Sequence, residues 1–359
     1  MVAISRARFR SVLGLAAIAA ALLVIPSGHA RLAATGPRPE SDGVGALVLV
    51  NSDGFPPVAI AHAQILLNLP PGVQAIVHVP ERLPAVARAY TDTFVEEFRS
   101  GRFVLVRSES QGNWARDFMP EAIVEPDGSV ALRQFGYYAR PGAEAAAGAL
   151  ARALGLPLQK SDVYLEFGNL IFDGRGTAFS TEYILRFNEW ASGGALTAAE
   201  TERRILRHLG LERIVWLPRQ PHERTGHIDM FAKLVGARTM LVADSHLPER
   251  QRMLADVAAR FAALGYRVIR LMHAEVAGAP EEVYSYTNST IVNGTAFVPV
   301  YFDPDDPVRP REFAALDAQA LETYRGLGFR VVPVPAAGLV SFGGSVHCLT
   351  RQLPRLPGR

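Results

Sequence analysis

The sequence predicts an α/β protein built from repeated units of strands and helices, and three observations support this prediction. Apolar runs typical of buried strands alternate with stretches of helical periodicity along the chain. Asp-Gly and Asn-Gly steps between apolar runs indicate hairpin turns among these elements. Polar residues also recur in apolar strand ends at a spacing of roughly 60 residues, which is typical of a repeat architecture.

The predicted elements follow one another as strand, helix and strand. Ala46 to Val50 and Ala75 to Val79 are typical of strands, and residues 57–69 between them are typical of an apolar helix. The later predicted helix and strand pairs are 84–98 with 103–106, 200–209 with 214–217, 248–264 with 267–271, and 310–325 with 329–334. Hairpin turns are expected at Asp127-Gly128, Asp173-Gly174 and Asn293-Gly294. No glycine-rich phosphate loop follows a strand, which argues against a nucleotide-binding doubly wound fold.

The N-terminal 30 residues are typical of a signal peptide. Arg6, Arg8 and Arg10 precede an apolar run at 12–25, which ends in small residues and is shorter than the roughly 20 residues that a membrane helix needs. We therefore predict an exported protein, periplasmic or secreted, with no stable membrane association once residues 1–30 are removed. A retained N-terminal anchor is the alternative. Residues 31–43 are expected to be a flexible segment and residues 44–359 a single catalytic domain.

Charge and cysteine content exclude several classes of protein. Residues 1–30 hold three arginines and no acidic residue, so removing them changes the formal charge from +2 to −1. No basic block remains for nucleic-acid binding. The sequence contains one cysteine, Cys348, which cannot form an internal disulfide. This thiol is therefore either buried filler or a reactive group.

The polar residues at strand ends could share one centre. They are Asp53, Asp117, Glu166, His227, Asn288 and Cys348. If their spacing reflects a true repeat, units arranged around an axis would each bring one of these side chains to the middle. A chance alignment is the alternative.

Three short motifs carry candidate chemistry. His227 and Asp229 begin a predicted strand at 228–235 and would project from the same face, as a general acid or base beside a carboxylate. The motif Asn113-Trp114-Ala115-Arg116-Asp117 supplies an indole face and a carboxylate, which suit a planar cation. Glycines at 343 and 344 allow the backbone before Cys348 to approach a ligand or to adopt a positive φ. Core packing for Trp114 and an Asp117–Arg116 ion pair remain the alternatives.

These residues resemble the agmatine deiminase and bacterial, Porphyromonas-type peptidylarginine deiminase family of guanidine-modifying enzymes. The blocks that match, in the order of the family, are Asn-Trp-Ala-Arg-Asp at 113–117, Leu-Glu-Phe-Gly-Asn at 165–169, Gly-His-Ile-Asp at 226–229, Tyr-Thr-Asn-Ser at 286–289, and Gly-Gly-Ser-Val-His-Cys at 343–348. The resemblance implies the five-bladed, pseudo-symmetric α/β propeller known as the pentein fold.

The resemblance also implies a role for each candidate residue. Cys348 would be the nucleophile, His227 the general acid and base, and Asp117 and Asp229 the carboxylates that hold a guanidinium. Trp114 would form part of the pocket wall, Asn288 would position substrate or thiol, and Glu166 would lie behind the site. No cofactor is implied, and no cluster has metal-ligand spacing.

Two departures from the family concern the first strand and the glutamate block. Residues 39–43, Pro-Glu-Ser-Asp-Gly, stand where the family has an acidic-aromatic segment. Phe167-Gly168 replaces the usual double glycine after Glu166, which could narrow the pocket or move Glu166.

The predicted function is hydrolysis of a guanidinium group, with two candidate substrates. Arg140, in Tyr-Tyr-Ala-Arg-Pro-Gly at 137–142, resembles the segment that grips the carboxylate of a C-terminal arginine, with Gly142 at the place of a second arginine. Together with export, this favours peptidylarginine, which would yield citrulline and ammonia. Agmatine, which would yield N-carbamoylputrescine on a route to putrescine, is the alternative enzyme substrate. A catalytically silent guanidine-binding protein is the alternative of another class. The oligomeric state is not predicted.

Overall fold

The computed structural model describes residues 36–40, 43–110, 112–137, 142–276, 278–304 and 311–355. The predicted signal peptide, most of the remaining N-terminal segment and Arg140 lie outside these described residues.

The described residues form a mixed α/β fold in which one connection pattern recurs. Two antiparallel strands form a hairpin, and a helical crossover then leads to a third strand parallel to the second. Three such sheets are β4 (Glu121–Val124), β5 (Val130–Gly136), α5 (Gly142–Leu154) and β6 (Leu158–Tyr164); β7 (Ile171–Phe172), β8 (Thr177–Thr181), α6 (Tyr183–Ala191), α7 (Ala198–Leu209) and β9 (Arg213–Leu217); and β10 (Ala232–Gly236), β11 (Thr239–Asp244), α8 (Pro248–Ala263) and β12 (Arg267–Met272).

One further sheet follows the same pattern, and another has the same strand directions, an additional strand and no hairpin connection between its first two strands. They comprise β15 (Thr290–Val292), β16 (Thr295–Val300), α9 (Glu312–Gly326) and β17 (Arg330–Pro335); and β18 (Thr350–Pro354), β1 (Val44–Val50), α1 (Pro56–Leu67), β2 (Gln74–Val79), α2 (Pro84–Thr93), α3 (Val95–Arg99) and β3 (Phe103–Arg107). β18 pairs antiparallel with β1, so the last of these sheets joins the two ends of the described fold. A short hairpin of β13 (Ala274–Glu275) and β14 (Val283–Tyr284) stands apart from the five sheets.

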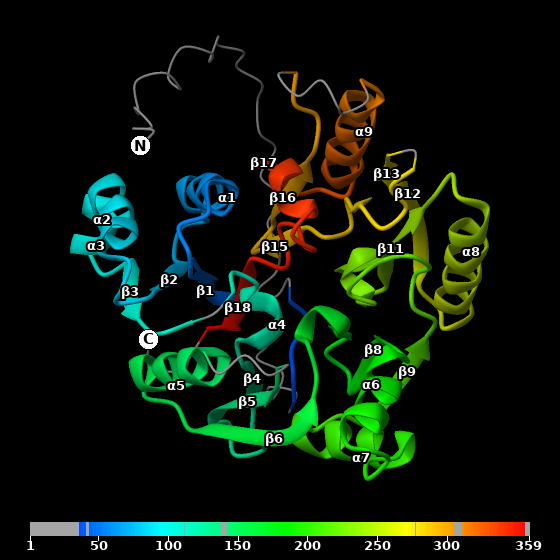
Figure 1. Cartoon of the computed structure of the whole chain (residues 1–359), viewed down its shortest axis with the longest axis horizontal. Helices are drawn as coiled ribbons and strands as arrows, with labels where there is room; N and C mark the ends of the chain where they lie inside the picture. The colour runs from blue at the N-terminus through cyan, green and yellow to red at the C-terminus, as the bar shows by residue number, and fades with distance from the viewer. Residues whose placement is uncertain are drawn as a thin grey trace, which may run out of the picture. The chain divides into compact units, whose positions relative to one another are not determined.

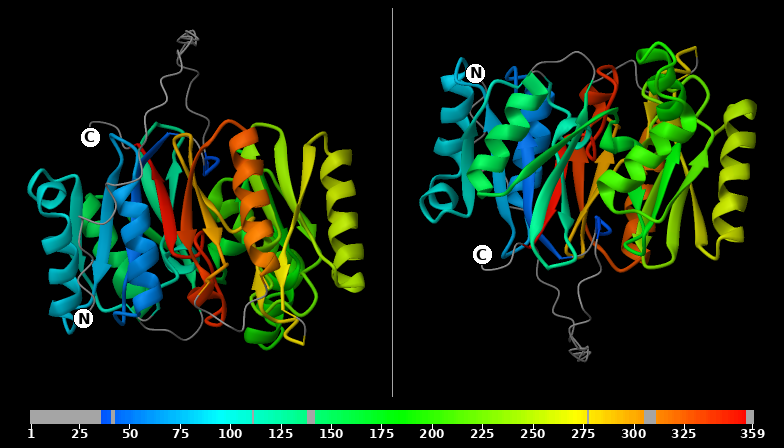
Figure 2. Two further views of the ribbon diagram at one scale, coloured as in Figure 1. Left: turned by 90° about the horizontal axis from the view of Figure 1, so that it is seen from above. Right: turned by 90° about the horizontal axis from the view of Figure 1, so that it is seen from below.

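The first strands of the hairpins begin between 50 and 61 residues apart from β4 onward, in agreement with the repeat predicted from polar spacing. In Figure 1 the sheets lie around a centre occupied by β18 and the short helix α4 (Ala115–Phe118), and the longer helices lie outside them. Both views in Figure 2 show α2 and α8 at opposite ends of this body.

Local sequence accounts for the turns. Gly128 has a φ of +82° in the hairpin between β4 and β5, and Asn293 and Gly294 have φ values of +44° and +80° between β15 and β16. Asn and Gly tolerate this left-handed conformation, which matches the twist of paired strands.

Two predicted elements were wrong in detail. The single helix expected at 84–98 is interrupted at Phe94, because this side chain is buried against Phe103 with a ring-centroid distance of 5.4 Å and its backbone leaves the helical region. The strand expected at 228–235 begins as a 3-10 turn, η3 (Ile228–Met230), and β10 starts only at Ala232. The Ile228 N–H donates to the side chain of Asn169 rather than to a neighbouring strand.

Short irregular segments lead into the hairpins and carry the predicted site. They are α4, the 3-10 turn η2 (Phe167–Asn169), η3, residues 286–289 and residues 345–349. α4 contacts η2, and η2 contacts η3. The repeated connection therefore brings together residues that are far apart in the sequence.

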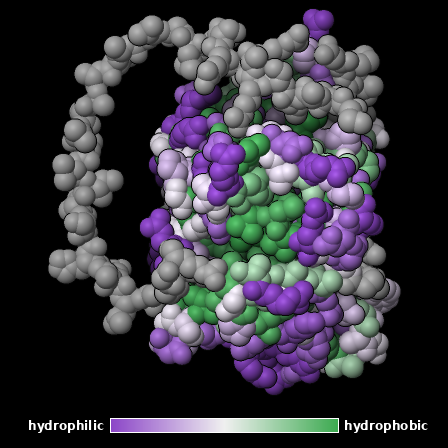
Figure 3. Space-filling view, turned by 90° about the vertical axis from the view of Figure 1, so that its left-hand side faces the viewer, coloured by the Kyte–Doolittle hydropathy of each residue, from purple (hydrophilic) through white to green (hydrophobic). Residues whose placement is uncertain are grey.

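The outer surface is mainly hydrophilic on the side where α2 and α3 lie. Figure 3 shows this side, with a hydrophobic area in the middle of the face. No helix within the described residues is both long and apolar enough to cross a bilayer.

Candidate active site

Cys348 lies just before β18, and its side chain is buried. The Asn288 amide Nδ2 donates to the Cys348 Sγ at 3.3 Å, and the Asn288 Oδ1 accepts the His347 backbone N–H at 2.9 Å. Asn288 therefore fixes both the thiol and the loop that carries it. The Cys348 Sγ also lies 3.9 Å from Oδ2 of Asp229.

His227 is held between two carboxylates. Its Nε2 lies 2.7 Å from Oε2 of Glu166, and its Nδ1 lies 3.7 Å from Oδ1 of Asp117. Glu166 thus contacts the ring nitrogen on the far side from Asp117 and orients the imidazole so that Nδ1 faces Asp117.

Three buried polar atoms of this site have no hydrogen-bond partner among the described residues: Asp117 Oδ1, His227 Nδ1 and Asp229 Oδ1. A Cβ added to Gly168 would lie 2.7 Å from Asp117 Oδ1, 2.7 Å from His227 Nδ1 and 3.1 Å from Asp229 Oδ2. The three side chains therefore converge on one space beside the Gly168 backbone. Buried polar groups are normally paired, so the two unpaired atoms beside Gly168, Asp117 Oδ1 and His227 Nδ1, indicate a place for a polar ligand.

The Gly168→Ala substitution should block this space. Its methyl group would displace two carboxylates and the imidazole, and we expect kcat/KM to fall by at least about 100-fold. Gly326→Ala in α9 is the matched control, because a Cβ there meets nothing within 4 Å. The measurements are kcat/KM from steady-state kinetics and the stability of both variants from thermal unfolding. A Gly168→Ala enzyme with wild-type kinetics would show that substrate lies elsewhere.

Electrostatics in the site favour a bound cation. Burial raises the pKa of Asp117 to about 8, with Glu166 and Asp229 adding to this and His227 opposing it. Burial lowers the pKa of His227, but Glu166, Asp117 and Asp229 outweigh it and bring that pKa to about 10. The imidazole is therefore protonated at neutral pH, and a planar cation bound beside Asp117 would favour the ionised form of that carboxyl.

The thiol is not ionised by its surroundings alone. Burial, followed by the charges of Asp229 and Asp117, raises the pKa of Cys348 well above its usual value. A cation bound between these carboxylates would reverse this effect, because an adjacent positive charge favours the thiolate.

The paired glycines before Cys348 serve two different purposes. Gly343 has a φ of +85°, in the left-handed region. A Cβ on Gly344 would lie 2.6 Å from the Trp114 ring, so the backbone packs directly on the indole. Trp114 is half-buried and lies beside the loop that carries Cys348.

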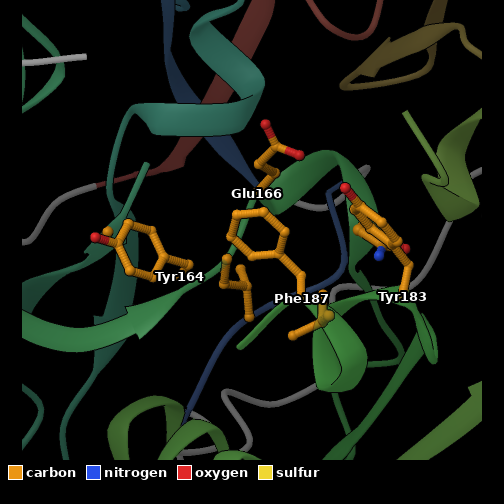
Figure 4. Close-up of a pocket in the computed structure, with 8 residues that line it drawn as sticks. Tyr164, Glu166, Tyr183 and Phe187 are labelled. Atoms are coloured by element: carbon orange, nitrogen blue, oxygen red, sulfur yellow. The ribbon is translucent and has the colours of Figure 1, made fainter. Parts of the chain in front are cut away.

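A small cavity of about 20 Å³ adjoins Glu166 on the side of α6 and was not predicted. Figure 4 shows Tyr164, Tyr183 and Phe187 around it, with the Glu166 carboxylate directed away from the aromatic rings. The spacing of Tyr183 and Phe187, four residues apart on one helix, was the sequence signal that could have indicated it.

One sequence expectation about the candidate residues needs correction. Asp53 is exposed and accepts from the Asn113 side chain at 3.1 Å, so it does not join the other polar strand-end residues. Glu40, from the segment 31–43, has a side chain that is 17% exposed and forms an ion pair with Arg116. Arg140 lies outside the described residues.

Comparisons with known protein sequences show the family of this chain. A sequence model of the Porphyromonas-type peptidyl-arginine deiminase family matches residues 56–354. The agmatine deiminase of Pseudomonas fluorescens Pf-5 is 27% identical over 350 residues, which cover 84% of this chain and 88% of that protein.

Solved structures show the same fold. A candidate arginine deiminase from Porphyromonas gingivalis superposes with a TM-score of 0.73 at 25% identity, covering 89% of this chain and 98% of that one. The agmatine deiminase of Enterococcus faecalis superposes with a TM-score of 0.71 at 18% identity, covering 90% and 97% of the two chains. Because the family model spans most of the sequence, the chain belongs to the Porphyromonas-type peptidyl-arginine deiminase family, whose members are hydrolases that act on C–N bonds of amidines.

Proposed function

We propose that this protein is an exported cysteine-dependent deiminase that converts the C-terminal arginine of peptides to citrulline and ammonia. The observation that carries the deimination is the convergence of Asp117, His227 and Asp229 beside Gly168, next to the buried thiol of Cys348. Two carboxylates match the paired N–H groups of a guanidinium, and a thiol and an imidazole supply the nucleophile and the acid.

The mechanism follows from these charges. Asp117 and Asp229 bind the guanidinium, and its positive charge favours ionisation of Cys348. The thiolate adds to the central carbon of the guanidinium and gives a tetrahedral adduct. Protonated His227 donates a proton to one nitrogen, the C–N bond breaks, and ammonia leaves.

A second half-reaction completes the turnover. The covalent thiouronium that remains is attacked by water, whose proton passes to the neutral His227. The C–S bond then breaks and the proton left on the added oxygen passes to the departing sulfur, which releases the ureido product and restores the Cys348 thiol. One histidine thus acts as the acid first and as the base second.

Two features of the sequence support a peptide substrate. The residues around Arg140 resemble a carboxylate-gripping segment, and the N-terminal 30 residues resemble an export signal. N-terminal sequencing of the protein recovered from outside the cytoplasm tests the second feature, with a start near Arg31 expected. An intact start at Met1 on a membrane-bound protein would support the retained anchor.

We also propose that the five repeated sheets are the blades of a pseudo-symmetric propeller.

Agmatine is the second candidate substrate, because the P. fluorescens relative that covers 84% of this chain is an agmatine deiminase. Agmatine ends in an ammonium group, which needs an acidic partner, whereas a C-terminal arginine ends in a carboxylate, which needs a basic one. The residue that meets the far end of the substrate therefore separates the two functions.

The Arg140→Ala substitution tests this separation. Loss of a charge-assisted contact should cost about 1.5–3 kcal/mol, or roughly 10- to 150-fold in kcat/KM, for a peptide ending in arginine. Turnover of agmatine should be unchanged or improved. Arg152→Ala, at an exposed arginine of α5, is the matched control and should affect neither substrate. Equal losses on both substrates, or a wild-type preference for agmatine, would favour the agmatine function instead.

A further inference from the structure

A half-buried carboxylate that the sequence assigned no role lies behind the site. Glu40 comes from the segment ahead of β1 and is 17% exposed. Its Oε1 accepts from Nη1 of Arg116 at 2.8 Å. Its Oε2 lies 2.8 Å from Nζ of Lys233 and 2.8 Å from Nε2 of His347.

The contact with Arg116 links Glu40 to Asp117, one of the two carboxylates proposed to bind the guanidinium, and to Cys348, the proposed nucleophile. Arg116 directly precedes Asp117 in α4. Its backbone N–H donates to the carbonyl of Cys348 at 3.0 Å, and its side chain is 1% exposed. Movement of the Arg116 side chain would therefore be transmitted to two of the proposed reacting groups.

The contact with His347 links Glu40 to Asp229, the second carboxylate proposed to bind the guanidinium. The His347 ring lies between two acids, with Nε2 2.8 Å from Glu40 and Nδ1 2.6 Å from Oδ2 of Asp229. An ionised acceptor at one ring nitrogen fixes both the tautomer and the orientation of an imidazole, and so determines what the other nitrogen presents. Lys233, the third partner, lies on β10 only four residues after Asp229.

Glu40 is charged in this setting. Burial raises the pKa of this carboxyl, but Arg116, His347 and Lys233 outweigh it and hold the pKa well below its ordinary value. Arg116 and Lys233 are 1% and 3% exposed, so without Glu40 two buried cations would lose a carboxylate partner close to the active site.

We propose that Glu40 is a positioning residue that, through His347, holds Asp229 in the orientation that binds the guanidinium. Its contacts with Arg116 and Lys233 also hold together the three chain segments that carry Asp117, Asp229 and Cys348. This inference rests on the proposed deimination, because it assigns Asp229 to the substrate.

The test compares Glu40→Gln with Glu275→Gln. Glu275 forms an equally buried ion pair with Arg250, at 1% and 12% exposure, outside the proposed machinery. Loss of a group that orients a binding residue from behind typically costs about 10- to 100-fold in activity, so we expect that loss in kcat/KM for Glu40→Gln, with most of it in KM. Glu275→Gln should lower the melting temperature comparably and leave kcat/KM within about threefold of wild type. Equal kinetic effects in the two variants would overturn the proposal.

A second readout needs no substrate and separates this inference from the proposed function. Cys348 is the only cysteine of the chain, so its alkylation by iodoacetamide can be followed by intact mass. Removal of the Glu40 charge should move the pH midpoint of alkylation to lower pH, because two cations nearby lose their counter-ion and favour the thiolate. Glu275→Gln should leave the midpoint unchanged.

The outcomes are distinguishable. A wild-type protein that deiminates no guanidine contradicts the proposed function, whereas unshifted alkylation in Glu40→Gln contradicts the inference. If Glu40→Gln does not fold, Glu40→Asp takes its place. This variant keeps the charge but shortens the side chain, so its alkylation midpoint should stay close to that of wild type, and a wild-type KM in it would overturn the proposal.

Discussion

Replacement of Cys348 by serine is expected to reduce deimination to below about one per cent of the wild-type rate while leaving the fold intact. A serine hydroxyl is far less ionised than a thiol near neutral pH, and the cation that favours a thiolate cannot make up the difference. The Asn288 side chain can donate to the hydroxyl as it does to the sulfur, so binding should persist.

Ammonia release and thermal unfolding of the two proteins give the measurement. The expected variant melts within a few degrees of wild type and still binds the substrate, as detected by calorimetry. Turnover by the serine variant at more than a few per cent of wild type would remove Cys348 from the role of nucleophile.

Replacement of His227 by alanine should lower kcat by at least the roughly 100-fold typical of a lost general acid or base, and by more if the histidine serves both half-reactions. Glu166 and Asp117 would then face each other without the imidazole between them, so some loss of stability is also expected.

His62→Ala is the matched control for this loss. His62 is fully buried and contacts the Tyr90 hydroxyl at 2.7 Å in a different part of the fold. Its removal should lower the melting temperature but leave kcat within about threefold of wild type. If the two variants lose activity in parallel with stability, His227 is a structural residue.

Most elements of the fold could be predicted because their sequence patterns are local. The hairpin turns, α8 and the strand β12 lie close to their predicted positions, since Asp-Gly or Asn-Gly steps and apolar periodicity act over a few residues. The break at Phe94 and the 3-10 turn at Ile228 were not predicted. Both depend on partners distant in the sequence, namely Phe103 for the first and the Asn169 side chain for the second.

The proposed site could be predicted in its residue types but not in its geometry. Asp117, His227, Asp229 and Cys348 stand in motifs that match a family, and the structure brings them together. Gly168 matters because a Cβ at this position would collide with Asp117, His227 and Asp229. No local sequence pattern reveals these contacts. Glu40 was missed because its segment has no hydrophobic periodicity, and only its three partners, all more than 70 residues away, show its contacts.

The central claim is that this site hydrolyses a guanidinium group, and product analysis tests it most directly. The full-length protein is incubated separately with agmatine, free arginine and a peptide ending in arginine, and both the ureido product and ammonia are quantified. We predict one ammonia per ureido group with at least one substrate, the peptide ending in arginine foremost, and no product with Cys348→Ser. No ureido product from any of the three substrates, or equal product from the serine variant, would contradict the account.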